Sequence, residues 1–230
     1  MSSRELKNFI PKMHQNVLDN RRMRIFAICL FAVAFFAATM ADPRISTAAG
    51  DPMTEVKATV DQVTSIVKDP SYKSAPAEHR ATLRQLIASH FDFADMARSA
   101  LGSHWKDLSD EQKNEFTQLF TQLMEASYMG KIESYTNQQV NFLQEISDSP
   151  GYSQVNTTIT QEGKEPITVN YRLKQEDGSW KVYDVIIDGI SLVANYRNQF
   201  SRVINTRGYD ALIQDIRAKV GQIGGGSSSQ

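Results

Sequence analysis

Cysteine is almost missing from this chain, because Cys29 is the only one among 230 residues. It lies inside an uncharged N-terminal run, so a chain that loses this run contains no cysteine at all. A protein of that kind needs no disulfide, even in an oxidising compartment. The absence of cysteine from such a chain also excludes a catalytic cysteine and a metal site with thiolate ligands.

The short motifs that define many enzymes are missing as well. The sequence has no Walker phosphate-binding loop, no dinucleotide-binding glycine pattern, no Gly-x-Ser-x-Gly nucleophile elbow and no His-Glu-x-x-His zinc motif. His90, Asp92 and His104 would be irregularly spaced as metal ligands, which favours ordinary capping or packing roles. Motif-defined enzyme classes therefore receive no support.

Positive charge precedes the longest apolar run of the chain. Three arginines within positions 21–24 lie ahead of the uncharged segment 25–41, which an Asp-Pro pair ends. This order is typical of a secretory signal peptide. We expect residues 1–49 to form a leader that is cleaved after Ala41 or Ala49, with a retained membrane anchor as the alternative.

Without residues 1–41 the chain is acidic. That segment takes away six of the 25 basic and two of the 26 acidic residues, so the remainder carries a formal charge of −5. Binding to a phosphate backbone depends on Lys and Arg, and a negative balance therefore disfavours nucleic acid as the partner.

Apolar residues recur at helical spacing in the first part of the remaining chain. Pro52 suits the first position of a helix that continues until Asp69-Pro70. A second helix is expected from Pro76, and the segment 91–101 continues helically until Gly102 offers a C-terminal cap. Ser109 with Gln112 resembles a capping box, which would open the longest helix.

That longest helix carries a broad stripe of large side chains in steps of three and four. Its members are Phe116, Leu119, Phe120, Leu123, Met124, Tyr128, Ile132 and Tyr135. Two more helices, 191–205 and 209–220, are expected to close the fold.

Between these helical blocks the pattern changes to four strand-like segments, 140–146, 152–160, 167–173 and 180–187. Short polar connections separate them, which favours an antiparallel meander. Helices, then strands, then helices predict an α+β fold in which a curved antiparallel sheet of about four strands is wrapped by N- and C-terminal helices around an apolar cavity. We expect one domain over 50–222 and a flexible Gly-Ser tail over 223–230.

The fourth strand is apolar on both faces. Strict alternation would place Val182 and Ile186 on one face, and Tyr183, Val185 and Ile187 on the other. Helices can cover one face, and the second is expected to border a cavity that suggests a ligand.

Asp184 lies on the same strand and offers an enzymatic alternative. A carboxylate inside an apolar cavity has a raised pKa and can act as a general base. The sequence supplies no second catalytic group, however, and pairing of Asp184 with Arg197 or Lys181 is the simpler interpretation. Asp188 is expected only to form a turn with Gly189.

Three segments together resemble a known family. They are 91–102 with Trp105, the helix 116–135, and above all 182–185 followed by Asp-Gly-Ile-Ser-Leu-Val-Ala-Asn-Tyr-Arg-Asn-Gln-Phe at 188–200. This arrangement is similar to the MlaC family of periplasmic phospholipid-binding proteins, also called toluene-tolerance proteins, over roughly 51–220.

The resemblance implies a periplasmic carrier that holds phospholipid acyl tails between helices and sheet and maintains outer-membrane lipid asymmetry. It implies exchange with an outer-membrane lipoprotein and porin complex and with an inner-membrane ABC transporter bearing an MCE ring. A non-enzymatic protein without a cofactor is expected, with phospholipid as its ligand and a monomeric state. An enzyme using Asp184 and a protein-binding adaptor remain the alternatives.

Apolar character and the faces described above select candidate pocket residues on the long helix, the sheet and the helix after residue 190. These are Phe116, Phe120, Met124, Tyr128, Val169, Tyr171, Val185, Ile187, Leu192, Tyr196 and Phe200. Arg98 and Arg197 are candidates for ion pairs that join helices through Asp92, Asp95 or Asp184.

Overall fold

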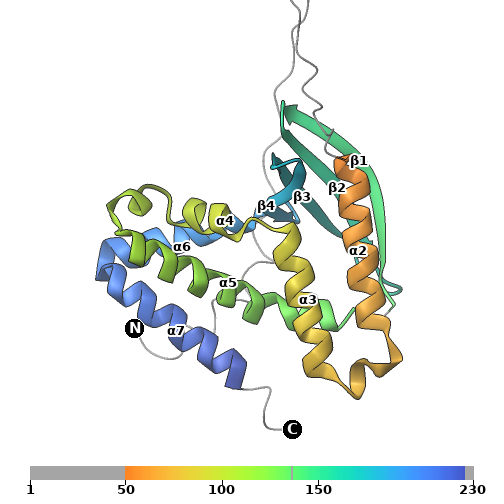
Figure 1. The fold of residues 1–230 in the computed structure, drawn as a ribbon, viewed down its shortest axis with the longest axis horizontal. Coiled ribbons are helices and arrows are strands. Elements are labelled where there is room, and N and C mark those ends of the chain that lie inside the picture. Colours follow the sequence, from red (N-terminus) through yellow and green to blue (C-terminus); the bar gives the residue numbers. More distant parts are fainter. Residues whose placement is uncertain (1–49, 136, 226–230) are drawn as a thin grey trace, which may run out of the picture. The chain divides into compact units, whose positions relative to one another are not determined.

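The computed structural model describes residues 50–135 and 137–225 (Figure 1). The predicted leader 1–49 and residues 226–230 of the predicted tail lie outside this part. The described elements are α2 (Pro52–Lys68), the 3₁₀ helix η2 (Pro70–Lys73), α3 (Pro76–His90), α4 (Phe93–Leu101), the 3₁₀ helix η3 (Gly102–Asp107), α5 (Asp110–Glu133), β1 (Gln139–Ser149), β2 (Tyr152–Thr160), β3 (Ile167–Glu176), β4 (Ser179–Ile187), β5 (Ile190–Ser191), α6 (Leu192–Arg207) and α7 (Tyr209–Gly225). Helix α7 therefore extends three residues into the predicted tail.

Local capping explains where several helices begin and end. Asp51 precedes Pro52 as the N-cap of α2, and its carboxylate accepts a hydrogen bond from the Thr54 N–H. Ser109 with Gln112 forms the predicted capping box of α5. Gly102 ends α4 with φ of 59°, which suits glycine, and its N–H donates to the Arg98 carbonyl. These predictions are confirmed.

The prediction of continuous helix from Pro76 to Leu101 is wrong at one point. Phe91 is extended, forms a parallel bridge with Val182, and separates α3 from α4. The Asp92 carboxylate then accepts a hydrogen bond from the Asp95 N–H and starts α4. A contact with a strand 91 residues later interrupts a helical pattern here, and short-range periodicity does not contain that information.

The sheet is an open antiparallel meander in the order β1-β2-β3-β4-β5. The four expected strands and the α+β class are confirmed, and the two-residue β5 is added. Asp188 and Gly189 both have positive φ, 48° and 79°, as expected of an Asp-Gly turn between strands. Strand β1 is an edge strand with two register shifts, and Leu143 at the first shift is 60% exposed.

The predicted faces of β4 are wrong because a register shift occurs in that strand. Val185 pairs with Tyr171 and Val182 pairs with Leu173, so β4 has an extra residue between them. This bulge places Val182 and Val185 in the same apolar cluster, while the Tyr183 ring packs edge-on against Tyr152 instead. We call the face that carries Val182 and Val185 the inner face.

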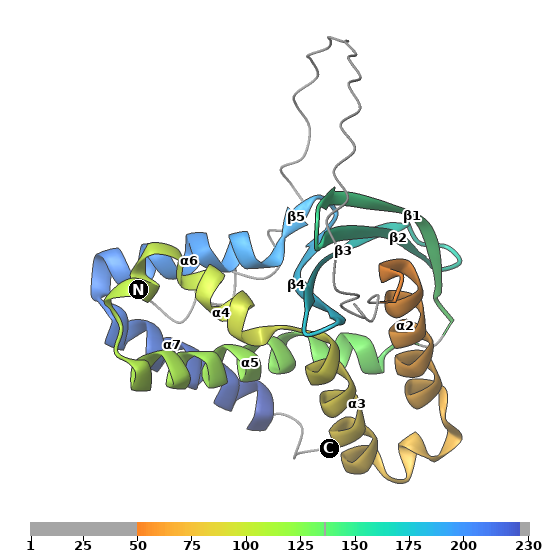
Figure 2. The same ribbon diagram turned by 45° about the horizontal axis from the view of Figure 1, so that its top comes forward.

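Two apolar clusters form the core. The helical cluster joins α4, α5, α6 and α7, and includes Phe116, Phe120, Leu123 and Phe200. The sheet cluster joins the inner face to Val56 of α2 and Leu192 of α6. In Figures 1 and 2, α2 lies against the inner face, and the strands curve around this helix.

Phe120 is fully buried in the helical cluster and contacts the Phe116, Tyr196 and Phe200 rings. We expect Phe120→Ala to lower the free energy of unfolding by about 3–5 kcal/mol, since it removes a buried aromatic ring and leaves a cavity. Urea denaturation followed by circular dichroism measures the change. A loss below about 1 kcal/mol would contradict this packing role.

Candidate functional site

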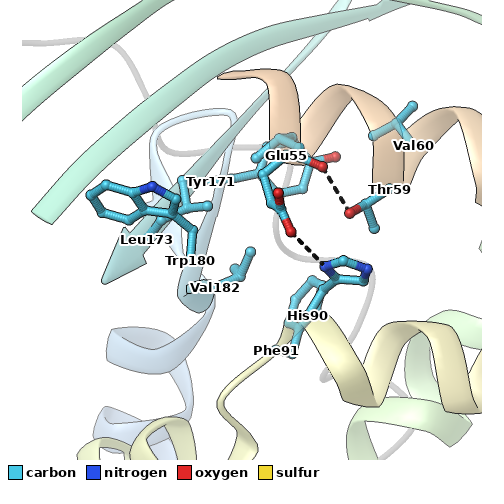
Figure 3. Close-up of a pocket in the computed structure, with 10 residues that line it drawn as sticks. Glu55, Thr59, Val60, His90, Phe91, Tyr171, Leu173, Trp180 and Val182 are labelled. Atoms are coloured by element: carbon cyan, nitrogen blue, oxygen red, sulfur yellow. Dashed lines mark hydrogen bonds and ion pairs between the residues drawn. The ribbon is translucent and has the colours of Figure 1, made fainter. Parts of the chain in front are cut away.

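A pocket lies between α2, the residues that follow α3, and strands β3 and β4 (Figure 3). Its walls are mainly apolar and include Val56, Val60, Phe91, Leu173 and Val182. The cavity volume is only about 30 Å³. Sites for drug-sized ligands usually enclose about 300–1,000 Å³, so this pocket is far smaller than such a site.

Glu55, Thr59 and His90 bring polar groups to one side of the pocket, and Trp180 lies on the other side (Figure 3). Glu55 Oε1 and His90 Nδ1 lie 3.8 Å apart and connect α2 to the end of α3. Thr59 Oγ1 donates to the Glu55 carbonyl at 2.9 Å, and Trp180 Nε1 donates to the Gly50 carbonyl at 2.6 Å. A ligand here would meet apolar walls and a single polar border.

The apolar inner face continues beyond the pocket. Phe142, Ile159, Tyr171 and Ile187 all pack against the sheet cluster but are only partly buried. Burial raises the pKa of the Tyr171 hydroxyl to about 12, and the residue, which is only partly buried as a whole, lines the pocket. Helices therefore cover this face incompletely.

The eleven residues predicted from the sequence divide between the two clusters. Val169, Val185 and Leu192 belong to the sheet cluster, and Tyr128, Tyr171 and Ile187 pack against it. Phe116, Phe120, Met124 and Phe200 lie in the helical cluster, with Tyr196 packed against them. Tyr171 is the one predicted residue that lines the described pocket.

Sequence reasoning missed the contribution of α2 and of the α3–α4 junction. The apolar stripe of α2 was visible, with Val56 and Val60 among its members, but its partner surface was not. Phe91 was assigned to a helix, although it is the strand-like residue that carries the chain to Val182. Both contacts join segments far apart in the sequence.

Asp184 serves as an anchor for α6. It is 4% exposed, and its carboxylate accepts hydrogen bonds from Ser191 Oγ at 2.6 Å and from the Val193 N–H at 3.1 Å. Arg172 Nη1 lies 3.9 Å away. The expected pairing with Arg197 or Lys181 is therefore wrong, and Asp184 does not line the pocket.

The two candidate arginines differ. Arg98 pairs with Asp95 inside α4 and so does not join two helices as expected, whereas Arg197 Nε donates to the Ser99 carbonyl at 2.6 Å and so connects α6 to the C-terminal end of α4. Over residues 50–135 and 137–225, no group of three His, Cys, Asp or Glu side chains could hold a metal ion. No helix in this part of the chain is long and apolar enough to cross a membrane.

Charged and aromatic groups fasten the far end of α2, η2 and α3 to α5. Arg80 donates twice to Glu133, from Nε at 2.6 Å and from Nη2 at 2.8 Å, and the Tyr72 hydroxyl donates to the same carboxylate at 2.8 Å. Arg84 pairs with Glu125 one turn further along α3. The Arg80 and Tyr72 hydrogen bonds hold the pKa of Glu133 below its usual range although burial opposes them.

These features define a class of protein: a small α+β domain with an open antiparallel sheet, one face of which is partly covered by helices and borders an apolar pocket. The model of the MlaC protein family matches residues 57–218. The chain belongs to the MlaC family.

Individual relatives agree with this membership. The chain is 25% identical over 204 residues to the intermembrane phospholipid transport system binding protein MlaC of Haemophilus influenzae, covering 86% of this chain and 93% of the relative. It is 24% identical over 171 residues to the toluene tolerance protein ttg2D of Pseudomonas putida, covering 73% and 80%. A solved structure of the phospholipid-binding protein from Ralstonia solanacearum, in complex with a phospholipid, matches with a TM-score of 0.69 and 29% identity, covering 76% of this chain and 99% of that one.

The depressed pKa of Glu133 predicts acid sensitivity. A carboxyl group with a folded-state pKa below its ordinary value of 4.5 stabilises the fold above that value, and this contribution is lost as pH falls through the folded-state pKa. Urea unfolding between about pH 6 and pH 3 should therefore show a steeper loss of stability in the wild type than in Glu133→Gln. Parallel pH profiles for the two proteins would contradict the role of this ion pair.

Proposed function

We propose that this protein is a periplasmic carrier that holds phospholipid acyl tails between its inner sheet face and its helices. Membership of the MlaC family supports the proposal, as does the phospholipid in the Ralstonia solanacearum relative. The observation within this chain that carries it is the incompletely covered inner face. Large apolar side chains such as Phe142, Ile159 and Ile187 are only partly buried, and a bound ligand would complete their burial.

The free energy of an exposed lipid explains why a carrier is needed. Burying a methylene contributes about 0.8 kcal/mol, so two tails of about fifteen methylenes would cost on the order of 20 kcal/mol to expose to water. Apolar walls that enclose the tails remove most of this barrier. The head group can stay at the polar border, near Glu55 and His90, or in solvent.

The small pocket places a requirement on this function. A cavity of about 30 Å³ has room for little more than two water-sized probes, and an acyl chain needs far more. Helices and sheet must therefore separate when lipid binds. Among the predicted residues we assign Tyr128, Val169, Tyr171, Val185, Ile187 and Leu192 to the lipid-binding face.

The same proposal extends to partners and location. The carrier would be exported by its N-terminal signal peptide and would exchange lipid with an outer-membrane lipoprotein and porin complex and an inner-membrane ABC transporter with an MCE ring. A carrier has no energy source, so the direction of transport would be set by these complexes. We expect no catalytic activity from Asp184, since its carboxylate is hydrogen-bonded to Ser191 and Val193 and is not part of the pocket lining.

Native mass spectrometry of protein purified from the periplasm without detergent tests the function directly. We expect a stoichiometric mass excess that is extracted into organic solvent as diacyl phospholipid, because the apolar inner face retains its ligand. A lipid-free mass, with no lipid acquired from added vesicles, would contradict the proposal and favour the protein-binding adaptor.

The two tryptophans allow the pocket to be located. Trp180 lines the pocket, whereas Trp105 packs against the helical cluster. In Trp105→Phe, loading with phospholipid brominated on its acyl chains should quench most of the remaining fluorescence, because bromine quenches at close range. In the matched Trp180→Phe variant the emission of Trp105 should change little. Equal quenching of both variants would mean that the tails lie elsewhere.

A further inference from the structure

The segment from α2 through η2 to α3, residues 52–90, crosses the inner face and is held differently at its two ends. One end, which we call the sheet end, carries the start of α2 and the end of α3. There the Met53 N–H donates to Glu145 at 3.3 Å, and Lys181 donates to the Ser89 carbonyl. Directly after α3, the Asp92 N–H donates to the Val182 carbonyl at 2.9 Å. Strands β1 and β4 therefore hold the sheet end through the Glu145 and Lys181 side chains, and the residue after α3 is held by a backbone hydrogen bond to β4.

The other end, which we call the catch end, contains the end of α2, η2 and the start of α3. Its contacts to α5 are the Glu133 carboxylate with Arg80 and Tyr72, together with the Arg84–Glu125 pair. Lys68 Nζ lies 5.5 Å from the centre of the Tyr135 ring just beyond α5. The Glu133 side chain is 16% exposed, so this polar group is largely shielded from solvent.

Apolar packing holds the sheet end but hardly holds the catch end. The residues of α2 that join or contact the sheet cluster are Met53, Val56 and Val60, all in its first half. No residue of α3 belongs to either described cluster, and Leu83 is its one buried side chain. The contacts from the catch end to α5 described above are charged or aromatic, and the groups that they release on breaking can form hydrogen bonds with water.

Exposed apolar side chains lie at the corresponding end of the inner face. Val140, Ile159 and Ile167 are paired across β1, β2 and β3 in one row. Ile167 is 44% exposed, and the other two are partly buried. The row begins five residues after Tyr135, which contacts Lys68 at the catch end. Movement of the catch end would uncover this row further.

We infer that Glu133 is the catch of a gate through which lipid enters and leaves. Release of Arg80 and Tyr72 from Glu133 lets the catch end swing away from the sheet about the sheet end. Acyl chains then pass over the row of Val140, Ile159 and Ile167 onto the inner face. This inference rests on the proposed function and names the route that lipid takes.

The dimensions of the sheet agree with this route. Six residues along β3 separate Ile167 in the row from Leu173 in the pocket, a distance of about 20 Å at about 3.3 Å per residue. One acyl chain fills half of a hydrocarbon core that is about 30 Å thick, or about 15 Å. A chain that enters at the row therefore reaches Tyr171 of the pocket lining, four residues or about 13 Å along β3, and stops short of Leu173.

Lipid exchange kinetics test the catch. Fluorescent phospholipid in vesicles is mixed with lipid-loaded protein, and transfer is followed by separation from a quencher in the vesicles. Glu133→Gln should transfer lipid about tenfold faster, which corresponds to about 1.4 kcal/mol less stabilisation of the closed state. Its lipid content by native mass spectrometry should equal that of the wild type.

A matched control lies on the same helix. Glu115 of α5 pairs with Arg217 of α7, far from the segment 52–90 in the chain and outside the pocket lining. Glu115→Gln should transfer lipid at the wild-type rate. Equal rates for Glu133→Gln and Glu115→Gln would overturn the inference.

Cross-linking tests the position of the gate without depending on one substitution. The part of the chain after residue 41 has no cysteine, so introduced pairs react alone. A short bismaleimide joining Cys residues in Arg80→Cys/Glu133→Cys should block loading, whereas joining them in Ser89→Cys/Lys181→Cys should leave loading unchanged. The opposite result would overturn the inference by placing the opening at the sheet end. A wild-type protein that never acquires lipid would overturn the proposed function as well.

Discussion

The apolar inner face of the sheet is the constraint on which the rest of this structure depends. An antiparallel sheet can leave one face in water, but the second must be covered. Here the cover consists of half of one helix, α2, with Phe91, Tyr128 of α5 and the first residue of α6, while large side chains such as Phe142 and Ile187 remain partly uncovered. The sheet is therefore left with apolar area that its own helices do not satisfy, and a lipid tail is a chemically suitable complement.

The helical cluster and the sheet cluster have different roles in the structure. The helical cluster is closed by aromatic rings that contact one another edge-on, as Phe116 and Phe200 do. The sheet cluster is small and borders the cavity. Asp184 connects the two regions by binding the start of α6 to β4. In the proposed gate, the helical cluster would stay in place while the segment 52–90 changes its separation from the sheet.

Local sequence patterns predicted most of the helices and strands but few of the residues that line the pocket. Capping residues, Asp-Gly turns and alternation gave the strand order and the starts of α2 and α5, because each depends on residues within a few positions. The bulge at Tyr183 and the extended Phe91 depend on partners far along the chain, and so the predicted faces of β4 and the helix through residue 91 were wrong. Tyr171 was found because its strand alternates clearly. Phe116 and Phe120 were chosen for size and apolar character, properties that a helix-packing position and a lipid contact share.

The edge strand β1 has a bearing on how such a protein stays dispersed. Its register shifts at Leu143 and near Asp148 bend the strand and break the regular row of outward backbone groups that another chain would need for pairing. A regular edge strand is a template for edge-to-edge aggregation. If the domain opens to exchange lipid as proposed, these two irregularities would keep its exposed edge from pairing with the sheet of a second molecule.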